Sequence, residues 1–205
     1  MKYLNICNDP WYRAKTTCSW VYWDGVFTNE ELNHIEAYCD SYETHLGTTF
    51  GADSEDEYKK HRVSDVRFFE RELENEWIFN RLNQTIENIN AKFYGFDLNG
   101  YKMFQYTKYD SSKVGRYDWH TDMEFDTNHH DGIEPRKLSI TIPLNEDYEG
   151  GQFQLNMSTE DNPHIVEQRR GRVIAFPSFL LHRVTPLTRG IRKSIVIWVV
   201  GPKFR

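Results

Sequence analysis

The sequence has few cysteines, no long apolar run and no excess of positive charge. Cys7, Cys18 and Cys39 are odd in number and match no zinc-binding spacing, which favours reduced thiols over a disulfide framework. The longest apolar run, Ile195 to Val200, has the length of a strand, whereas a membrane-spanning helix needs about 18 apolar residues. The first residues also lack the apolar stretch of a secretory signal. We therefore expect a cytoplasmic protein with no membrane segment.

The charge balance disfavours nucleic acid as a partner. Lysine and arginine number 25 against 31 aspartates and glutamates, giving a formal net charge of −6, whereas domains that bind phosphate backbones are usually basic. The short basic stretch 168–172 (QRRGR) is expected to be a solvated turn. A length of 205 residues suits one domain, 1–205, better than two separate cores.

The first half of the chain, residues 1–95, is predicted to be a mixed and partly helical support region. Thr28 and Glu31 form a capping box, which predicts a helix start. Apolar residues at helical spacing predict a second helix over 73–93, with Gly95 as its stop. The acidic stretch 51–60 (GADSEDEYKK) between them is expected to be a solvated loop.

The second half, residues 96–205, is predicted to form a β-rich core. Short runs of β-forming residues alternate with Gly, Pro and Asp clusters, as in sandwiches and barrels. The segment 137–142 alternates strictly, with leucine and isoleucines on one face and Ser139 and Thr141 on the other. Seven or eight such strands predict two packed sheets of the jelly-roll type, with the N-terminal helices covering one sheet.

Two His-x-Asp patterns suggest a metal site, although the spacing alone is common. His120 and Asp122 lie in a strand-like run, where residues two apart point to the same face and can reach one cation. The second pattern, His129-His130-Asp131, has the composition of a turn. We expect those two histidines to lie in a solvated loop over a site mouth rather than to bind a metal.

His182 is the candidate for a third metal ligand. Two histidines and one carboxylate form a facial set that leaves coordination positions open for substrate and oxygen. Arg192 follows His182 by ten residues (192 − 182) and opens an alternating strand. A guanidinium at that point can bind the far carboxylate of a dicarboxylic acid with two hydrogen bonds.

Residues 102–202 resemble the iron(II)/2-oxoglutarate-dependent dioxygenases. They look most like the prolyl-4-hydroxylase branch and, within it, the bacterial PKHD-type hydroxylases. The segments that carry the resemblance occur in the family's order: 119–122 (WHTD), 137–151 (KLS through YEGG), 176–178 (FPS) and 182–194 (HRVTP through TRGIRKS). The resemblance implies a mainly β fold with N-terminal helices around a double-stranded β-helix, a jelly-roll core of the cupin-like type.

Carried over by position, the resemblance implies three iron ligands, His120, Asp122 and His182. It also implies that Arg192 binds the C5 carboxylate of 2-oxoglutarate, with Ser194 as a helper on the same strand face. Asp122 argues against halogenation, because related halogenases lack a carboxylate there.

Family members often add a tyrosine hydroxyl to the cosubstrate site, and two tyrosines compete for this role. Tyr106 and Tyr109 lie on opposite faces of one predicted strand. We select Tyr106, although the sequence does not say which face points into the barrel. The position at which animal oxygen-sensing prolyl hydroxylases carry a tyrosine is aliphatic here and is assigned to Ile142. Trp198 is expected to belong to the core.

The resemblance implies a hydroxylase that uses Fe(II), 2-oxoglutarate and O2, with ascorbate as a possible additive, and that releases succinate and CO2. A peptidyl prolyl residue in a peptide or protein is the substrate it favours. A free amino acid, a small metabolite or a nucleobase stays open as an alternative, the nucleobase being disfavoured by the acidic charge. A non-catalytic β-barrel that binds a metal or a dicarboxylate is the alternative from a different class.

Overall fold

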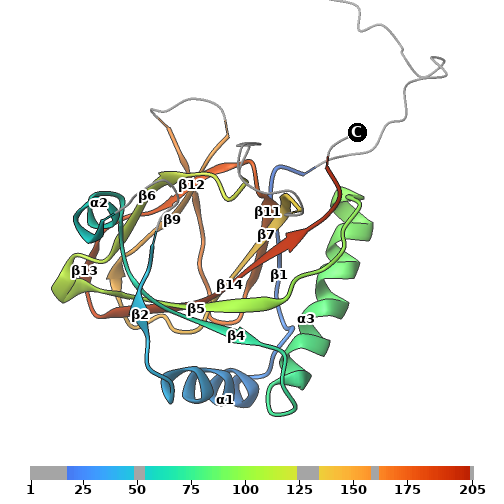
Figure 1. Cartoon of the computed structure of the whole chain (residues 1–205), viewed down its shortest axis with the longest axis horizontal. Helices are drawn as coiled ribbons and strands as arrows, with labels where there is room; N and C mark the ends of the chain where they lie inside the picture. The colour runs from blue at the N-terminus through green and yellow to red at the C-terminus, as the bar shows by residue number, and fades with distance from the viewer. Residues whose placement is uncertain (1–17, 49–53, 124–133, 158–161, 204–205) are drawn as a thin grey trace, which may run out of the picture.

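Two antiparallel β-sheets form the centre of the molecule, and two helices cover the larger sheet (Figure 1). This computed structural model describes residues 18–48, 54–123, 134–157 and 162–203. Cys7, His129 and His130 lie outside the described residues. Within the described residues, no helix is long and apolar enough to cross a membrane.

The larger sheet has seven strands and carries one wall of a central pocket. From edge to edge its strands are β1 (Val21–Trp23), β11 (Val173–Pro177), β7 (Arg136–Pro143), β14 (Ile191–Val200), β5 (Met103–Asp110), β4 (Asp65–Glu70) and β2 (His45–Leu46). The long strand β14 lies between β7 and β5, with Ser194 opposite Pro143 on one side and Thr107 on the other. Both flanks of β14 are therefore hydrogen-bonded, which holds its side chains in a fixed register.

The smaller sheet has five strands and carries the opposite wall. In order they are β10 (His164–Val166), β9 (Phe153–Asn156), β12 (Leu181–Val184), β6 (Arg116–His120) and β3 (Arg62–Val63). A separate pair joins β13 (Leu187–Arg189) to β8 (Glu149–Gly150), and a short 3-10 turn, η3 (Ser111–Lys113), connects β5 to β6. Two antiparallel sheets agree with the predicted mainly β fold.

The two predicted helices are present. Helix α1 (Asn29–Asp40) begins with the expected capping box, because the Thr28 hydroxyl accepts from the Glu31 amide while the Glu31 carboxylate accepts from the Thr28 amide. Helix α3 (Glu76–Ile89) continues into one π-helical turn, η2 (Asn90–Tyr94). This turn ends at Gly95, which has the left-handed backbone (φ 64°) that favours glycine.

The prediction of a solvated loop over 51–60 is wrong for its described part. Residues Glu55–His61 form helix α2, and the Ser54 hydroxyl accepts from the Glu57 amide at its start. Its first turn is acidic and its last turn is basic, an arrangement that suits the helix dipole. The same charge run that suggested a loop therefore stabilises a short exposed helix.

Strand β7 shows how the sheet separates the core from the pocket. Leu138, Ile140 and Ile142 are fully buried in the main apolar cluster, which also holds apolar residues of α1 and α3. Ser139 lies on the other face, where it contacts the candidate site, and Thr141 lines the pocket there. The predicted alternation is confirmed, and it places the hydroxyl groups of Ser139 and Thr141 on the pocket side.

Candidate metal centre and cosubstrate pocket

The candidate metal centre begins with two histidines on neighbouring strands. Strands β6 and β12 pair so that His182 lies directly opposite His120, with a register shift just after His182. The two imidazole rings are 4.1 Å apart between centroids. The strand pairing thus brings together side chains that are far apart in the sequence.

The main chain sets the hydrogen-bonding state of both imidazoles. His120 Nδ1 lies 2.8 Å from the Asp118 carbonyl oxygen, and His182 Nδ1 lies 2.9 Å from the Leu180 carbonyl oxygen. A carbonyl only accepts, so each Nδ1 carries a proton, and in a neutral imidazole the Nε2 then keeps its lone pair. This tautomer is the one in which Nε2 can bind a metal.

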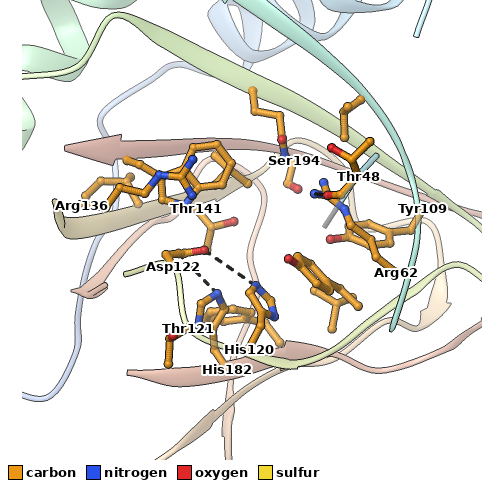
Figure 2. A pocket seen from close by; sticks show the side chains of 18 of the residues that line it. Thr48, Arg62, Tyr109, His120, Thr121, Asp122, Arg136, Thr141, His182 and Ser194 are labelled. Carbon is orange, nitrogen blue, oxygen red and sulfur yellow. Dashed lines mark hydrogen bonds and ion pairs between the residues drawn. The ribbon is translucent and has the colours of Figure 1, made fainter. Parts of the chain in front are cut away.

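Asp122 is held in place by two serines. Its backbone amide donates to the Ser178 carbonyl oxygen (2.9 Å), and its Oδ2 accepts from the Ser139 hydroxyl (2.6 Å). The hydroxyls of Ser139 and Ser178 are themselves 2.9 Å apart. These contacts hold the carboxylate in place, and Figure 2 shows it facing His120 and His182.

The three side chains fit an octahedral metal ion. His120 Nε2 is 3.8 Å from Asp122 Oδ1, and His182 Nε2 is 3.4 Å from Asp122 Oδ2. One ligand atom from each residue lies within 4.8 Å of the others. Adjacent ligands around one ion with bonds of about 2.1 Å would be about 3 Å apart, so small shifts close the site. Two imidazoles and a carboxylate on one side are the donor set of non-haem iron(II) oxygenases.

The pKa values of the candidate ligands suit metal binding near neutral pH. Burial, with added repulsion from His182, lowers the pKa of His120 to about 3 and keeps its imidazole neutral. Burial opposes ionisation of Asp122, but the two histidines, the Ser139 hydroxyl and Arg136 outweigh it and hold its pKa below the usual range. The site therefore offers the neutral imidazole of His120 and the negative carboxylate that a divalent cation requires.

Aromatic rings enclose the histidines. The Tyr117 ring stacks on His120 with centroids 3.5 Å apart, and Phe176 meets His182 edge-on at 4.7 Å. Phe153 also packs edge-on against His182 at 5.8 Å. These rings fix the imidazoles and limit the access of water to them.

The opposite wall of the pocket presents Arg192, which is 1% exposed. Its Nη1 donates to the Ser194 hydroxyl (3.1 Å), and its guanidinium carbon lies 5.3 Å from the centre of the Tyr109 ring. Among the described residues no carboxylate pairs with Arg192, whereas its neighbour Lys193 binds Glu36 and Asp40. A buried, unpaired guanidinium in a pocket is suited to an anionic ligand.

The choice of Tyr106 for the cosubstrate site is corrected by the structure. Tyr106 is fully buried on the helix-facing side of β5, where its hydroxyl donates to Asp40 (2.7 Å). Tyr109, three residues later on the opposite face, lines the pocket together with Ser194 (Figure 2), and its ring faces the Arg192 guanidinium. The two tyrosines differ because the apolar helices cover the even-numbered face of this strand.

Two further expectations about the pocket also change. Ile142 lies in the helix-facing core, so the nearest side chain of β7 that lines the pocket on the other face is Thr141. Trp198, expected in the core, lines the pocket, and the Arg136 guanidinium lies over its ring at 4.2 Å. The period-two pattern of β14 is preserved, but the face that carries Trp198 is the pocket face.

The pocket, about 290 Å³ in volume, is cationic. Arg62, Arg136 and Arg192 line it, against one carboxylate among its lining residues, Asp122. The Arg62 side chain donates to the Ser64 hydroxyl and to the Thr48 carbonyl oxygen rather than to an acid. Figure 2 shows Arg62 and Arg136 on opposite sides of Asp122. Such a lining suits a site for carboxylic acids.

Sequence comparison identifies the second half of the chain. Residues 104–200 match the 2OG-Fe(II) oxygenase superfamily. These residues belong to that superfamily. A PKHD-type hydroxylase of Synechococcus sp. (strain CC9311) is 32% identical over 100 residues, which are 48% of this chain and 42% of that protein. A PKHD-type hydroxylase of Escherichia coli O6:K15:H31 (strain 536 / UPEC) is 30% identical over 96 residues, 46% of this chain and 41% of that protein. The matched segment thus spans about two fifths of each relative.

Solved structures share the fold of the oxygenase superfamily over most of the chain. A Pseudomonas putida prolyl-4-hydroxylase superposes with a TM-score of 0.68 at 17% identity, covering 89% of this chain and 92% of that one. A Trichoplax adhaerens prolyl hydroxylase, solved with a peptide fragment of hypoxia inducible factor, gives 0.68 at 17% identity, covering 89% and 83%. These similarities confirm the predicted double-stranded β-helix with N-terminal helices.

The structure brings together five of the six predicted site residues in one pocket: His120, Asp122, His182, Arg192 and Ser194. Sequence analysis missed the support residues Ser139, Tyr117 and Gln168. For Ser139 the sequence offers one signal, its place on the polar face of the alternating strand. The sequence predicts a solvated turn for Gln168, yet its side chain accepts a hydrogen bond from Arg192. Its partner is 24 residues away, a pairing that local sequence patterns do not reveal.

Proposed function

We propose that this protein is an iron(II)- and 2-oxoglutarate-dependent dioxygenase that hydroxylates a C–H bond of its substrate. One observation carries the proposal: the cluster of His120, Asp122 and His182 shares a pocket with the buried, unpaired Arg192. When bound, iron(II) together with 2-oxoglutarate and O2 supplies the oxidising chemistry, one oxygen atom going to the substrate and the other to succinate, with release of CO2.

Each residue of the pocket has a distinct task in this proposal. His120, Asp122 and His182 hold the metal on one side, which leaves three positions for cosubstrate and oxygen. Arg192 and Ser194 bind the C5 carboxylate of 2-oxoglutarate, and Tyr109 flanks them. Burial of these donors strengthens the charge-assisted hydrogen bonds, because water does not compete for them.

The first experiment tests the reaction class without knowledge of the substrate. Anaerobic addition of 2-oxoglutarate to the Fe(II)-loaded protein is expected to produce a visible metal-to-ligand charge-transfer band. Arg192→Ala is expected to weaken this band strongly, because the guanidinium no longer holds the far carboxylate. A protein that binds iron but gives no band at millimolar 2-oxoglutarate would instead be a non-catalytic metal-binding module.

We further propose a peptidyl prolyl residue as the substrate. Support comes from the prolyl hydroxylases among the similar structures, one of which was solved with a peptide fragment. Recombinant protein is incubated with Fe(II), 2-oxoglutarate, ascorbate and proline-containing peptides, and hydroxyproline (+16 Da) is measured by mass spectrometry. Turnover of 2-oxoglutarate without hydroxyproline would reject the substrate and keep the reaction class. Free amino acids tested in parallel cover the alternative of a small-molecule substrate.

A further inference from the structure

We propose that Gln168 is a positioning residue that aims the Arg192 guanidinium at the cosubstrate without neutralising it. This inference rests on the proposed function, since it concerns the same carboxylate-binding site. Gln168 lies between β10 and β11, outside every segment that carried the family resemblance. Its role follows from its hydrogen bonds and from its lack of charge.

The Gln168 side chain binds one edge of the guanidinium. Its Oε1 accepts from Arg192 Nε (3.0 Å) and from Arg192 Nη2 (2.7 Å). With the bond from Nη1 to Ser194, three of the five N–H donors of Arg192 are used within the described part of the chain. Two donors remain, which is the number needed for a bidentate bond to a carboxylate.

Gln168 is itself fixed to the turn that packs against Arg192. Its Nε2 donates to the Gly151 carbonyl oxygen (3.1 Å), and the Tyr148 hydroxyl lies 3.5 Å from its Oε1. Gly151 has a left-handed backbone (φ 58°), and a Cβ there would lie 3.2 Å from Arg192 Cδ and 2.6 Å from Leu187 Cδ1. The Gly151 carbonyl oxygen therefore holds the Gln168 side chain, and the missing side chain of Gly151 leaves space for the methylene groups of Arg192.

The neutral amide matters as much as the geometry. Arg192 is almost completely buried and has no carboxylate partner among the described residues, so its full charge is available to a ligand. A glutamate at position 168 would accept the same two hydrogen bonds but would cancel that charge. Glutamine thus provides orientation while preserving the attraction for a dicarboxylate.

Three variants of the 205-residue chain test this inference. Gln168→Leu removes the hydrogen bonds, Gln168→Glu adds a competing carboxylate, and Gln152→Glu adds the same charge nearby. Gln152 is exposed and bonds to Gln154 rather than to Arg192, which makes it the matched control. The primary measurement is the dissociation constant for 2-oxoglutarate, from the anaerobic charge-transfer band and from calorimetry with metal-free protein.

We expect Gln168→Leu to weaken 2-oxoglutarate binding by about tenfold, equivalent to about 1.4 kcal/mol. Gln168→Glu should weaken it more, while Gln152→Glu stays within about twofold of the wild type. The KM for 2-oxoglutarate should rise with little change in kcat at saturation, because the chemistry at the metal is untouched.

Thermal melting establishes that each variant is folded, and Gln168→Met provides a second uncharged variant if Gln168→Leu is unstable. If Gln168→Glu and a folded uncharged variant (Gln168→Leu or Gln168→Met) both bind 2-oxoglutarate as tightly as the wild type, the inference is overturned and the proposed function stands. A wild-type protein that binds no 2-oxoglutarate would reject the proposed function itself. Equal weakening by Gln168→Glu and Gln152→Glu would also overturn the inference, because the effect would then be one of general charge.

Discussion

Tyr117 stacks face to face on His120, with ring centroids 3.5 Å apart and planes inclined by only 14°. The Arg62 guanidinium lies on the same tyrosine, 4.8 Å from the ring centre. Arg62 is in turn fixed by the Ser64 hydroxyl. A candidate metal ligand is thus braced by a stack that reaches to the edge strand β3.

This stack predicts a difference between two substitutions of Tyr117. Tyr117→Leu removes the flat surface against His120, and we expect the affinity for a divalent metal to fall about tenfold, as for other groups that orient metal ligands. Tyr117→Phe keeps the surface and should bind the metal nearly as well as the wild type. Titration with Co(II), followed by its visible spectrum, measures both. Equal affinities for the leucine and phenylalanine variants would contradict the bracing role.

The two tyrosines of β5 predict opposite phenotypes. Tyr109→Phe should raise the KM for 2-oxoglutarate, since Tyr109 lies in the pocket beside Arg192. Tyr106→Phe should leave that KM unchanged but lower the free energy of unfolding by about 1 to 2 kcal/mol, because it removes a hydrogen bond to the charged Asp40. Steady-state kinetics and urea denaturation separate the two effects. A cosubstrate defect in the Tyr106 variant would reverse the assignment.

Metal binding should stabilise the fold through Asp122. A ligand present at 100 times its dissociation constant stabilises the native state by about 2.7 kcal/mol, so Fe(II) under anaerobic conditions should raise the melting temperature of the wild type. Asp122→Ala should lose this increase, because two histidines remain without their carboxylate partner. A chelator should abolish 2-oxoglutarate turnover, and added Fe(II) should restore it. A metal-dependent melting temperature in Asp122→Ala equal to that of the wild type would contradict the site.

The pH dependence of stability should reflect the contact between Lys193 and helix α1. Lys193 binds Asp40 (2.6 Å) and Glu36 (2.8 Å). Burial opposes ionisation of Asp40, but the bonds from Lys193 and Tyr106 outweigh it and hold its pKa below the usual 3.8. Burial also disfavours the charge of Lys193, but its acidic partners outweigh it and raise its pKa above 10.5.

The pKa of Asp40 is lowered and the pKa of Lys193 is raised, and together they set the pH range over which this ion pair stabilises the fold. The stability contributed by Asp40 is complete above pH 3.8 and is lost as the pH falls through its lowered pKa. The contribution of Lys193 is complete below pH 10.5 and is lost as the pH rises through its raised pKa. The difference in unfolding free energy between wild type and Lys193→Met should therefore be constant between about pH 4 and 10 and shrink outside it. A difference that does not shrink at either extreme would show that the lysine acts through packing alone.

The second half of the fold could be predicted from the sequence because its strands alternate clearly. Strand β7 shows this alternation with its leucine and isoleucines on one face, and its observed bounds differ from the prediction by one residue at each end. The short strands of the first half could not be predicted in this way. Strand β3 has only two residues, and its pairing of Arg62 with Tyr117 depends on a partner 55 positions away (117 − 62).

The residue types of the candidate site could be predicted from the sequence, but the residues that hold them in place could not. The candidate metal ligands and Arg192 have chemistry that few other roles require, so their pattern was informative. Tyr106 was chosen wrongly because strand parity separates two faces without indicating which one the helices cover. Gln168 gave no signal, since a glutamine in a charged stretch resembles any surface residue until its contact with Arg192 is seen.

The pairing of β6 with β12 has a consequence for how the protein matures. His120 and His182 are separated by 62 positions (182 − 120), so neither hairpin formation nor local helix folding can bring them together. Only a chain that has completed its long-range strand assembly brings the two imidazoles together. Binding of the iron proposed above would therefore follow strand assembly, and newly made or misassembled copies would not carry a redox-active ion.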